Sequence, residues 1–293
     1  MRSSLRHLRH ARSSRPAVSL RPMSSGSRFM SSQSSQPQRP QHPQSPPSPS
    51  SSSVNPSEVA HFSALASTWW DPHGSSRILH LMNPLRHDFI NACLSSSPTS
   101  PTAPLRYLDV GCGGGIFAES AARLSSTKSV TAIDPTPDIL AVAKQHAAQD
   151  PTLTKEKLQY VGATIETLPK DQFDVVTCFE VVEHVEHPAA FLDRCGAFVK
   201  PGGWLVMSTI ARTWMSWFTT NLVAEDLLGI VPKGTHDWTK YINEDELRGH
   251  FAGRKEWGVP RVLGVVYVPG LGWKEVKGSE KVGNYFLGVQ KIQ

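Results

Sequence analysis

The sequence has no acidic residue in its first 57 positions, where eight arginines are scattered among serine, proline, glutamine and histidine; Glu58 is the first acid. Such a stretch has too little apolar surface to offset the entropy lost when a core is ordered. The remainder, about 240 residues, suits one domain. We therefore expect residues 55–293 to form one folded domain and residues 1–54 to lie outside it.

Cysteine and long apolar runs are also scarce. The four cysteines are widely spaced without a CxxC pair, which excludes a disulfide framework and a cysteine zinc site. No run of about 18 apolar residues occurs, so no helix is expected to span a membrane. The net charge of +5 comes from the eight early arginines; without them 22 basic residues face 25 acidic ones, about −3. This balance argues against a nucleic-acid partner.

The arginine-rich segment is typical of an organellar transit peptide. Arg2, Arg6 and Arg9 recur at helical spacing, and the apolar core of a secretory signal is missing. We interpret residues 1–54 as a mitochondrial transit peptide followed by a flexible Pro/Ser/Gln linker. The alternative is a disordered basic tail that carries no targeting signal.

The rest of the chain begins with helical patterns and then alternates between apolar strands and helices. Asn55, Pro56 and Glu58 are typical of a helix start, with Glu58 at the third position of a capping box. Alternation implies a mostly parallel sheet with helices on both faces, which binds ligands at the carboxyl ends of its strands. The expected helices are 55–69, 84–94, 115–124, 138–149 and 188–198, and the expected strands are 106–110, 130–134, 158–162, 173–178, 204–208, 261–267 and 285–291, the last two an antiparallel pair.

A glycine-rich loop, Leu108–Gly115, follows the first of these strands and opens a helix. Gly111 and Gly113 let the backbone approach a ligand closely. A dinucleotide fingerprint would place a third glycine at Ile116. Asp109 would repel a pyrophosphate but suits the ammonium group of S-adenosylmethionine. Asp134 ends the next strand and can bind ribose hydroxyls, as it would for NAD. The pattern favours S-adenosylmethionine over NAD, FAD or an empty structural turn.

Two later segments support this interpretation. Phe173–Val176 enters a strand and Lys200–Gly203 precedes the next, a pairing that resembles class I methyltransferases. The predicted fold is therefore a Rossmann-like α/β domain with a seven-stranded, mostly parallel sheet. In that fold Thr164 and Ile165 would lie beside the adenine.

Three residues with ionisable side chains follow the fourth strand: Glu180, Glu183 and His184. On a helical turn they would share one face. Two carboxylates and an imidazole could hold a divalent ion that activates a catechol hydroxyl. Without metal, His184 could act as a general base. A third possibility is a solvated first turn of a helix.

Several motifs together resemble the ubiquinone-biosynthesis O-methyltransferases, in their mitochondrial branch. They extend over nearly the whole folded part, from about Phe62 to Ile292. The segments that carry the resemblance are Trp69–Gly74, Leu79–Arg86, Leu108–Gly115, Glu180–Val185 and Val231–Asp237.

The resemblance implies methylation of polyprenylated catechol and quinol intermediates by S-adenosylmethionine. It implies cofactor contacts from Arg86, Gly111, Asp134 and Phe179, and Mg²⁺ at Glu180, Glu183 and His184. We predict that Glu183 and His184 are the catalytic residues. It further implies a peripheral position on the matrix face of the mitochondrial inner membrane, in a complex with other coenzyme Q biosynthesis proteins. Alternatives are a class I methyltransferase for another small molecule or RNA, and a non-catalytic scaffold.

The segment from Thr213 to Val231 is rich in tryptophan, phenylalanine and leucine. Such residues suit a bilayer interface, which fits a substrate with an isoprenoid tail. The alternative is a lid that packs on the protein itself, and Glu225 and Asp226 argue against deep insertion of the whole segment.

Overall fold

The computed structural model describes residues 52–74, 76–97, 103–213 and 238–292. The predicted transit peptide, most of the segment 213–231 and the motif Val231–Asp237 lie outside the described residues. The domain boundary predicted near residue 54 therefore stays a prediction.

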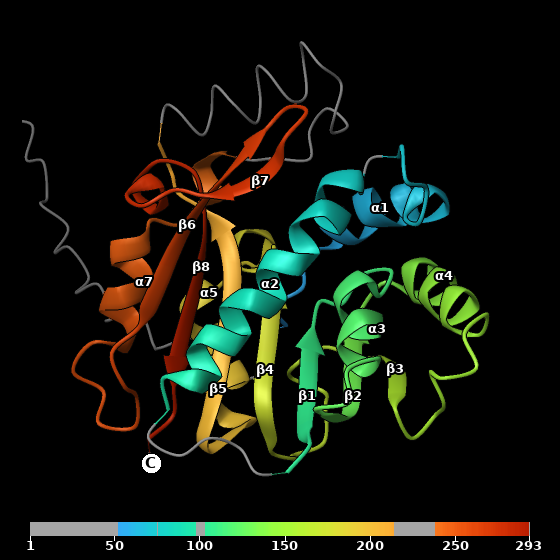
Figure 1. Cartoon of the computed structure of the whole chain (residues 1–293), viewed down its shortest axis with the longest axis horizontal. Helices are drawn as coiled ribbons and strands as arrows, with labels where there is room; N and C mark the ends of the chain where they lie inside the picture. The colour runs from blue at the N-terminus through green and yellow to red at the C-terminus, as the bar shows by residue number, and fades with distance from the viewer. Residues whose placement is uncertain (1–51, 75, 98–102, 214–237, 293) are drawn as a thin grey trace, which may run out of the picture. The chain divides into compact units, whose positions relative to one another are not determined.

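An eight-stranded sheet forms the centre of the described part, with the strand order β3-β2-β1-β4-β5-β8-β6-β7 (Figure 1). The first five strands in this order, β3, β2, β1, β4 and β5, pair in parallel. The last three, β8, β6 and β7, extend the sheet by antiparallel pairing. The predicted class is confirmed, but the described sheet has eight strands rather than seven. Their bounds are β1 Leu105–Val110, β2 Thr127–Asp134, β3 Leu158–Gly162, β4 Phe173–Phe179, β5 Val199–Ile210, β6 Arg261–Val268, β7 Gly272–Glu275 and β8 Asn284–Gln290.

Helices cover both faces of this sheet, and α2 crosses the front in Figure 1. None of the helices in the described ranges is long and apolar enough to cross a bilayer. The α-helices are α1 Pro56–Leu65, α2 Arg77–Ser95, α3 Ile116–Ala122, α4 Pro137–Ala147, α5 Pro188–Ala197 and α7 Glu244–Phe251, and the 3-10 helices are η1 Ala66–Thr68, η2 Val182–His184, η4 Trp238–Lys240 and η5 Ser279–Lys281.

Two hydrophobic cores lie on opposite faces of the sheet, because neighbouring residues of a strand point to opposite sides. Val175 of β4 packs with Phe117 of α3 in one core, and Val176 packs with Phe191 of α5 in the other. The central strands are buried on both faces, which explains why they read as continuous apolar runs rather than as alternating ones.

The prediction of the second helix was wrong at its start. Pro84 was expected in the first turn, whereas α2 begins at Arg77 and contains Pro84 in its interior. An internal proline removes one backbone hydrogen bond. Packing overrides this cost, because Met82 is buried in the core and Asn83 donates to Ile116 O and Ser120 Oγ of α3 at 3.2 and 2.8 Å.

Candidate functional site

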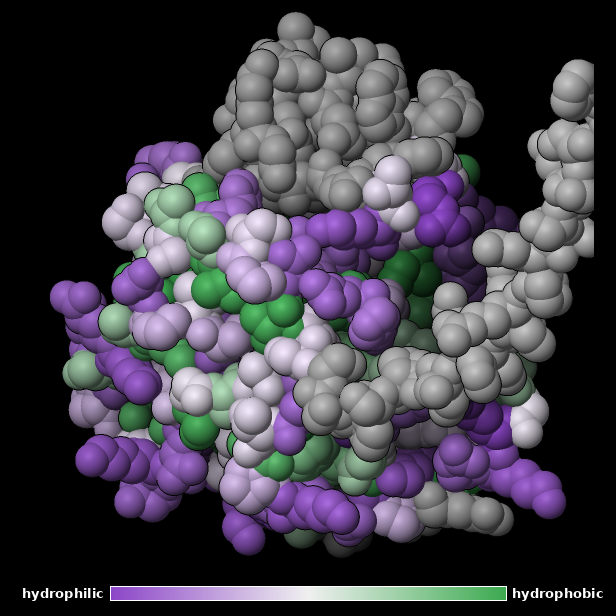
Figure 2. Space-filling model, turned by 180° about the vertical axis from the view of Figure 1, so that it is seen from behind, coloured by the Kyte–Doolittle hydropathy of each residue, from purple (hydrophilic) through white to green (hydrophobic). Residues whose placement is uncertain are grey.

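A cavity of about 550 Å³ opens at the carboxyl ends of β1, β2 and β4, where the sequence predicted a ligand site. Its walls combine the glycine loop with side chains of α1, α2 and the β6–β7 region. All the predicted site residues line it: Arg86, Asp109, Gly111, Gly113, Asp134, Phe179, Glu180, Glu183 and His184, together with Thr164 and Ile165. Figure 2 shows the face of the protein opposite to that in Figure 1. Hydrophilic residues cover most of this face, and hydrophobic residues are visible in the gaps between them.

The glycine loop is held in a conformation that needs glycine. Gly111 and Gly113 have φ angles of +69° and +52°. A Cβ atom on Gly113 would lie 2.5 Å from the Trp69 ring. Asp134 braces the loop, because one carboxylate oxygen accepts the N–H of Gly113 at 3.0 Å and the other accepts the N–H of Thr136 at 2.8 Å. The carboxylate predicted to bind ribose therefore also shapes the loop.

Asp109 is a buried acid on the cavity wall, 3% exposed. Burial raises its pKa to about 7, and the nearby charge of Asp134 acts in the same direction, whereas Thr177 and Arg86 oppose the rise. A buried carboxylate that is costly to ionise gains most from a bound cation. Its setting suits the ammonium group of a ligand.

Arg86 is a buried cation in α2, 4% exposed. Its guanidinium carbon lies 4.9 Å from the centre of the Phe179 ring, a cation–π distance. Burial lowers its pKa, and the charges of Glu180 and Asp109 raise it. Its Nε atom is buried without a hydrogen-bond partner in the described part of the chain. A ligand carboxylate at this end of the cavity could accept from it.

The segment Glu180–His184 does not form the helical turn that was expected. Glu180 has a φ of +56°, the only positive value for a non-glycine residue in the described ranges, and only Val182–His184 form a 3-10 turn. Glu180 Oε1 accepts from Ser208 Oγ at 2.6 Å, and Glu183 Oε2 accepts from Thr209 Oγ1 at 2.8 Å.

Glu183 is 4% exposed, and its pKa rises to about 7 through burial and the neighbouring charge of Glu180. His184 is engaged elsewhere, since its Nδ1 lies 3.0 Å from Glu58 Oε2. That hydrogen bond, with help from Lys240, lowers the pKa of Glu58 to about 2. Burial alone would lower the pKa of His184, but Glu58 and Glu183 raise it overall.

The predicted magnesium ligands fit a divalent ion in chemistry but do not converge on one point in this arrangement. Their side chains bond to three different neighbours, and within the described ranges no group of three or more His, Cys, Asp or Glu residues could hold a metal ion. The two carboxylates are close enough to raise the pKa of one of them, as oxygen ligands around a cation often are. The metal site stays a prediction.

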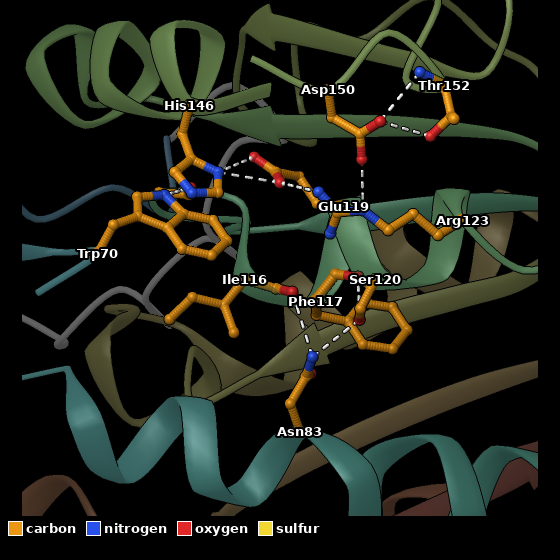
Figure 3. Close-up of polar contacts among 11 residues, drawn as sticks. Trp70, Asn83, Ile116, Phe117, Glu119, Ser120, Arg123, His146, Asp150 and Thr152 are labelled. Carbon is orange, nitrogen blue, oxygen red and sulfur yellow. Dashed lines mark hydrogen bonds and ion pairs between the residues drawn. The ribbon is translucent and has the colours of Figure 1, made fainter. Parts of the chain in front are cut away.

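Trp69 and Trp70, the Trp-Trp motif, precede the glycine loop in the sequence and pack against it. Trp69 packs on Gly113 and Gly114, and Trp70 Nε1 donates to Gly114 O at 2.9 Å. The Trp70 ring stacks on His146 of α4 at 3.5 Å between centroids (Figure 3). His146 and Arg123 both contact the buried Glu119 of α3 at 2.9 and 2.8 Å (Figure 3). The motif thus joins the N-terminal segment, the loop and two helices.

Sequence reasoning missed two residues of the site. Glu58 was expected to cap its own helix, but it contacts His184 and Lys240 instead. Thr177 lies in the buried strand β4, and its hydroxyl donates to Asp109. For Thr177 the available signal was a threonine among the apolar residues Val175, Val176 and Cys178, at the position of β4 that pairs with Asp109.

Comparisons with known proteins agree with this geometry. A family model described as a methyltransferase domain matches residues 77–254. The solved structure of a magnesium protoporphyrin IX methyltransferase from Synechocystis with bound S-adenosylmethionine matches with a TM-score of 0.53 and 15% identity, over 82% of this chain and all of that one. A methyltransferase from Thermotoga maritima matches with a TM-score of 0.54 and 16% identity, over 80% of this chain and all of that one. These likenesses concern the fold.

Sequence relatives are more specific. The chain is 41% identical to the mitochondrial ubiquinone biosynthesis O-methyltransferase of Candida albicans, over 83% of this chain and 86% of that protein. It is 46% identical to the mitochondrial enzyme of the same name from Schizosaccharomyces pombe, over 82% and 87%. A bacterial enzyme so named, from Bradyrhizobium, is 40% identical over 74% and 86%. The chain therefore belongs to the ubiquinone biosynthesis O-methyltransferases and is an S-adenosylmethionine-dependent enzyme.

Proposed function

We propose that the enzyme methylates a ring hydroxyl of 3,4-dihydroxy-5-polyprenylbenzoate and of demethylubiquinol. The observation that carries the proposal is the composition of the cavity described above. It combines a buried acid and a buried cation at the glycine loop, an acid–imidazole group after β4, and apolar walls from α1 and β6. These three parts suit S-adenosylmethionine, a phenolic hydroxyl and a prenylated ring.

At the cofactor end, Asp109 would bind the ammonium group and Arg86 the carboxylate of the methionine part. Asp134 would accept from the ribose hydroxyls, while Gly111 and Gly113 keep the loop thin enough for close approach. The Phe179 ring lies against the Arg86 guanidinium and helps to hold it in place. Each assignment pairs a ligand group with a buried protein group of complementary charge or hydrogen-bonding type.

At the acceptor end, His184 would take the hydroxyl proton while the oxygen attacks the methyl group. The O–C bond forms as the S–C bond of the sulfonium breaks, which gives a methyl ether and S-adenosylhomocysteine. Glu183, buried beside His184, favours the imidazolium that forms. In the metal-bound form that we also propose, Glu180, Glu183 and His184 would hold Mg²⁺; His184 would then be a ligand rather than the base, and the ion would lower the pKa of the acceptor hydroxyl.

We also propose that the enzyme works in mitochondria, on the matrix face of the inner membrane, as a peripheral protein in a complex with other coenzyme Q enzymes. The arginine-rich first 54 residues and the mitochondrial relatives support the compartment. Leu271, 68% exposed in the turn after β6, supports membrane contact. Its neighbours Pro269 and Trp273 line the cavity, so a bilayer at this turn would meet the entrance for a lipid substrate.

The test is transfer of labelled methyl from S-adenosylmethionine to a prenylated dihydroxybenzoate in liposomes, with and without chelator. Turnover that stops on chelation and returns with Mg²⁺ supports both the substrate class and the metal. If the chelator does not change the rate, the proposed substrate is supported and the proposed metal is ruled out. Cofactor binding without any turnover would favour the alternative, a methyltransferase for another small molecule.

A further inference from the structure

Glu58 links three segments that lie far apart in the sequence. Its Oε2 atom is 3.0 Å from Nδ1 of His184, which follows β4, and its Oε1 atom is 2.9 Å from Nζ of Lys240 in η4. The side chains of Glu58 and His184 are 18% and 17% exposed. A hydrogen bond shielded from water to this degree constrains its partners more than a surface pair does.

The chemistry of this contact decides which imidazole nitrogen carries the proton. An ionised carboxylate can only accept hydrogen bonds, so the proton of a neutral His184 must be on Nδ1. Lys240 donates to the other oxygen of Glu58 and so favours this acceptor-only form. The lone pair of the imidazole is then on Nε2, which is the atom left to take a proton from a ligand in the cavity.

The same helix also sets the orientation of the imidazole ring. Phe62 lies one turn after Glu58 on α1, and its ring meets the His184 ring edge-on, with centroids 5.0 Å apart and an interplanar angle of 83°. Residues four apart share one face of a helix. A single face of α1 therefore contacts His184 through one hydrogen bond and one aromatic contact.

We propose that Glu58 is a positioning residue: from α1 it holds His184 in the tautomer and ring orientation that leave the lone pair of Nε2 available to the cavity, where it accepts the hydroxyl proton in the metal-free site or ligates the ion in the metal-bound site. Docking of α1 thus completes the part of the site to which His184 belongs. The kinetic consequence rests on the function proposed above, whereas the tautomer is a property of the protein alone.

A simpler role for Glu58 would be to anchor α1 over the cavity. The chain offers a matched control for that role, because Ser63, on the same helix, bonds Asp138 of α4 and does not contact His184. Ser63→Ala weakens the docking of α1 at its other end. Lys240→Met removes the ion pair of Glu58 while it leaves the contact to His184 in place.

The experiment compares Glu58→Ala, Glu58→Gln, Ser63→Ala and Lys240→Met in the purified full chain. The first measurement is the ¹⁵N spectrum of histidine-labelled protein at a pH where His184 is neutral, with His184→Asn to assign its signals. The second is kcat and KM for both substrates, with cofactor affinity measured separately by calorimetry.

We expect a protonated Nδ1 in the wild type and in Glu58→Gln, whose amide oxygen can still accept. Glu58→Ala should show a mixture of tautomers and lose at least about tenfold in kcat, which is less than the roughly hundredfold or more that loss of a general base itself typically costs, with cofactor affinity unchanged. An unchanged His184 tautomer in Glu58→Ala would overturn the proposal, as would a loss of kcat no greater than that of Ser63→Ala. If no variant or wild type turns over, the spectrum still decides the tautomer, and the failure belongs to the proposed reaction.

Discussion

The hydroxyl of Thr177 donates a hydrogen bond to Oδ1 of Asp109 at 2.7 Å, across the paired strands β1 and β4. It is one of the few groups that favour the ionised form of this buried acid, whose pKa burial raises to about 7. The cofactor site of the free enzyme thus contains an acid that changes its charge near neutral pH. This property leads to two predictions about cofactor binding.

Affinity for S-adenosylmethionine should increase as the pH rises through about 7. Only the ionised Asp109 attracts the ammonium group, so below its pKa each pH unit should cost up to about tenfold in affinity. Calorimetry between pH 5.5 and about 8 checks this. Asp109→Asn serves as the control, because it should bind weakly and with a flatter pH dependence. A wild-type curve that matches that of the variant would remove Asp109 from the ammonium site.

Thr177→Val should move this pH dependence to higher pH. Valine has nearly the shape of threonine but cannot donate, so the pKa of Asp109 rises further. At pH 7 the variant should bind the cofactor more weakly, and at high pH the two proteins should converge. A uniform loss at every pH would instead indicate that the substitution damages packing. The thermal unfolding temperature of the variant distinguishes the two cases.

Gly113→Ala should weaken cofactor binding and destabilise the protein more than Gly202→Ala does. Both glycines have positive φ, which costs a residue with a Cβ atom about 1–2 kcal/mol. At Gly202 nothing lies within 4 Å of the added atom, whereas at Gly113 it would meet the Trp69 ring at 2.5 Å. Denaturant unfolding and cofactor titration measure both variants. Equal losses in the two would show that the contact with Trp69 is easily relieved.

Much of the fold could be predicted from the sequence, because short apolar runs indicate its strands and glycine or proline residues indicate its turns. β3 was predicted with its exact bounds, since Leu158–Gly162 is an apolar run that ends in glycine. β7 and α7 were not predicted. β7 is four residues long, and α7 has eight residues with a strongly polar composition, so neither carries a clear periodic signal.

The sequence predicted the site residues that belong to a local motif of strand and glycine loop. It did not predict contacts between segments that are far apart in the chain. Asp109 is identified by its place at the end of β1, and Gly113 by its place in the glycine loop that follows. The contact between Glu58 and His184 spans 126 positions, and no local pattern indicates it. The turn expected at Glu180 failed for a similar reason, because its backbone follows pairing with β5 and its side chain bonds Ser208.

Glu183→Gln should lower turnover by about tenfold or more while cofactor affinity stays the same. Glutamine keeps the size of the side chain and can still accept from Thr209, so the fold should survive. The substitution removes the negative charge beside His184 and, on the proposed metal site, one ligand. Rates are measured with and without chelator. A wild-type rate in both conditions would exclude Glu183 from catalysis and metal binding alike.

Leu271→Glu should weaken binding to liposomes far more than Val259→Glu. The two side chains are 68% and 86% exposed and lie beyond opposite ends of β6, so each substitution adds one charge at an exposed site with little effect on the core. Only Leu271 lies next to the cavity residues Pro269 and Trp273. Burial of a leucine side chain is worth about 1.5–3 kcal/mol, so its loss from a bilayer contact should reduce partitioning at least about tenfold. Flotation with liposomes that contain anionic lipid measures the difference. Equal binding of both variants would place the membrane contact elsewhere on the protein.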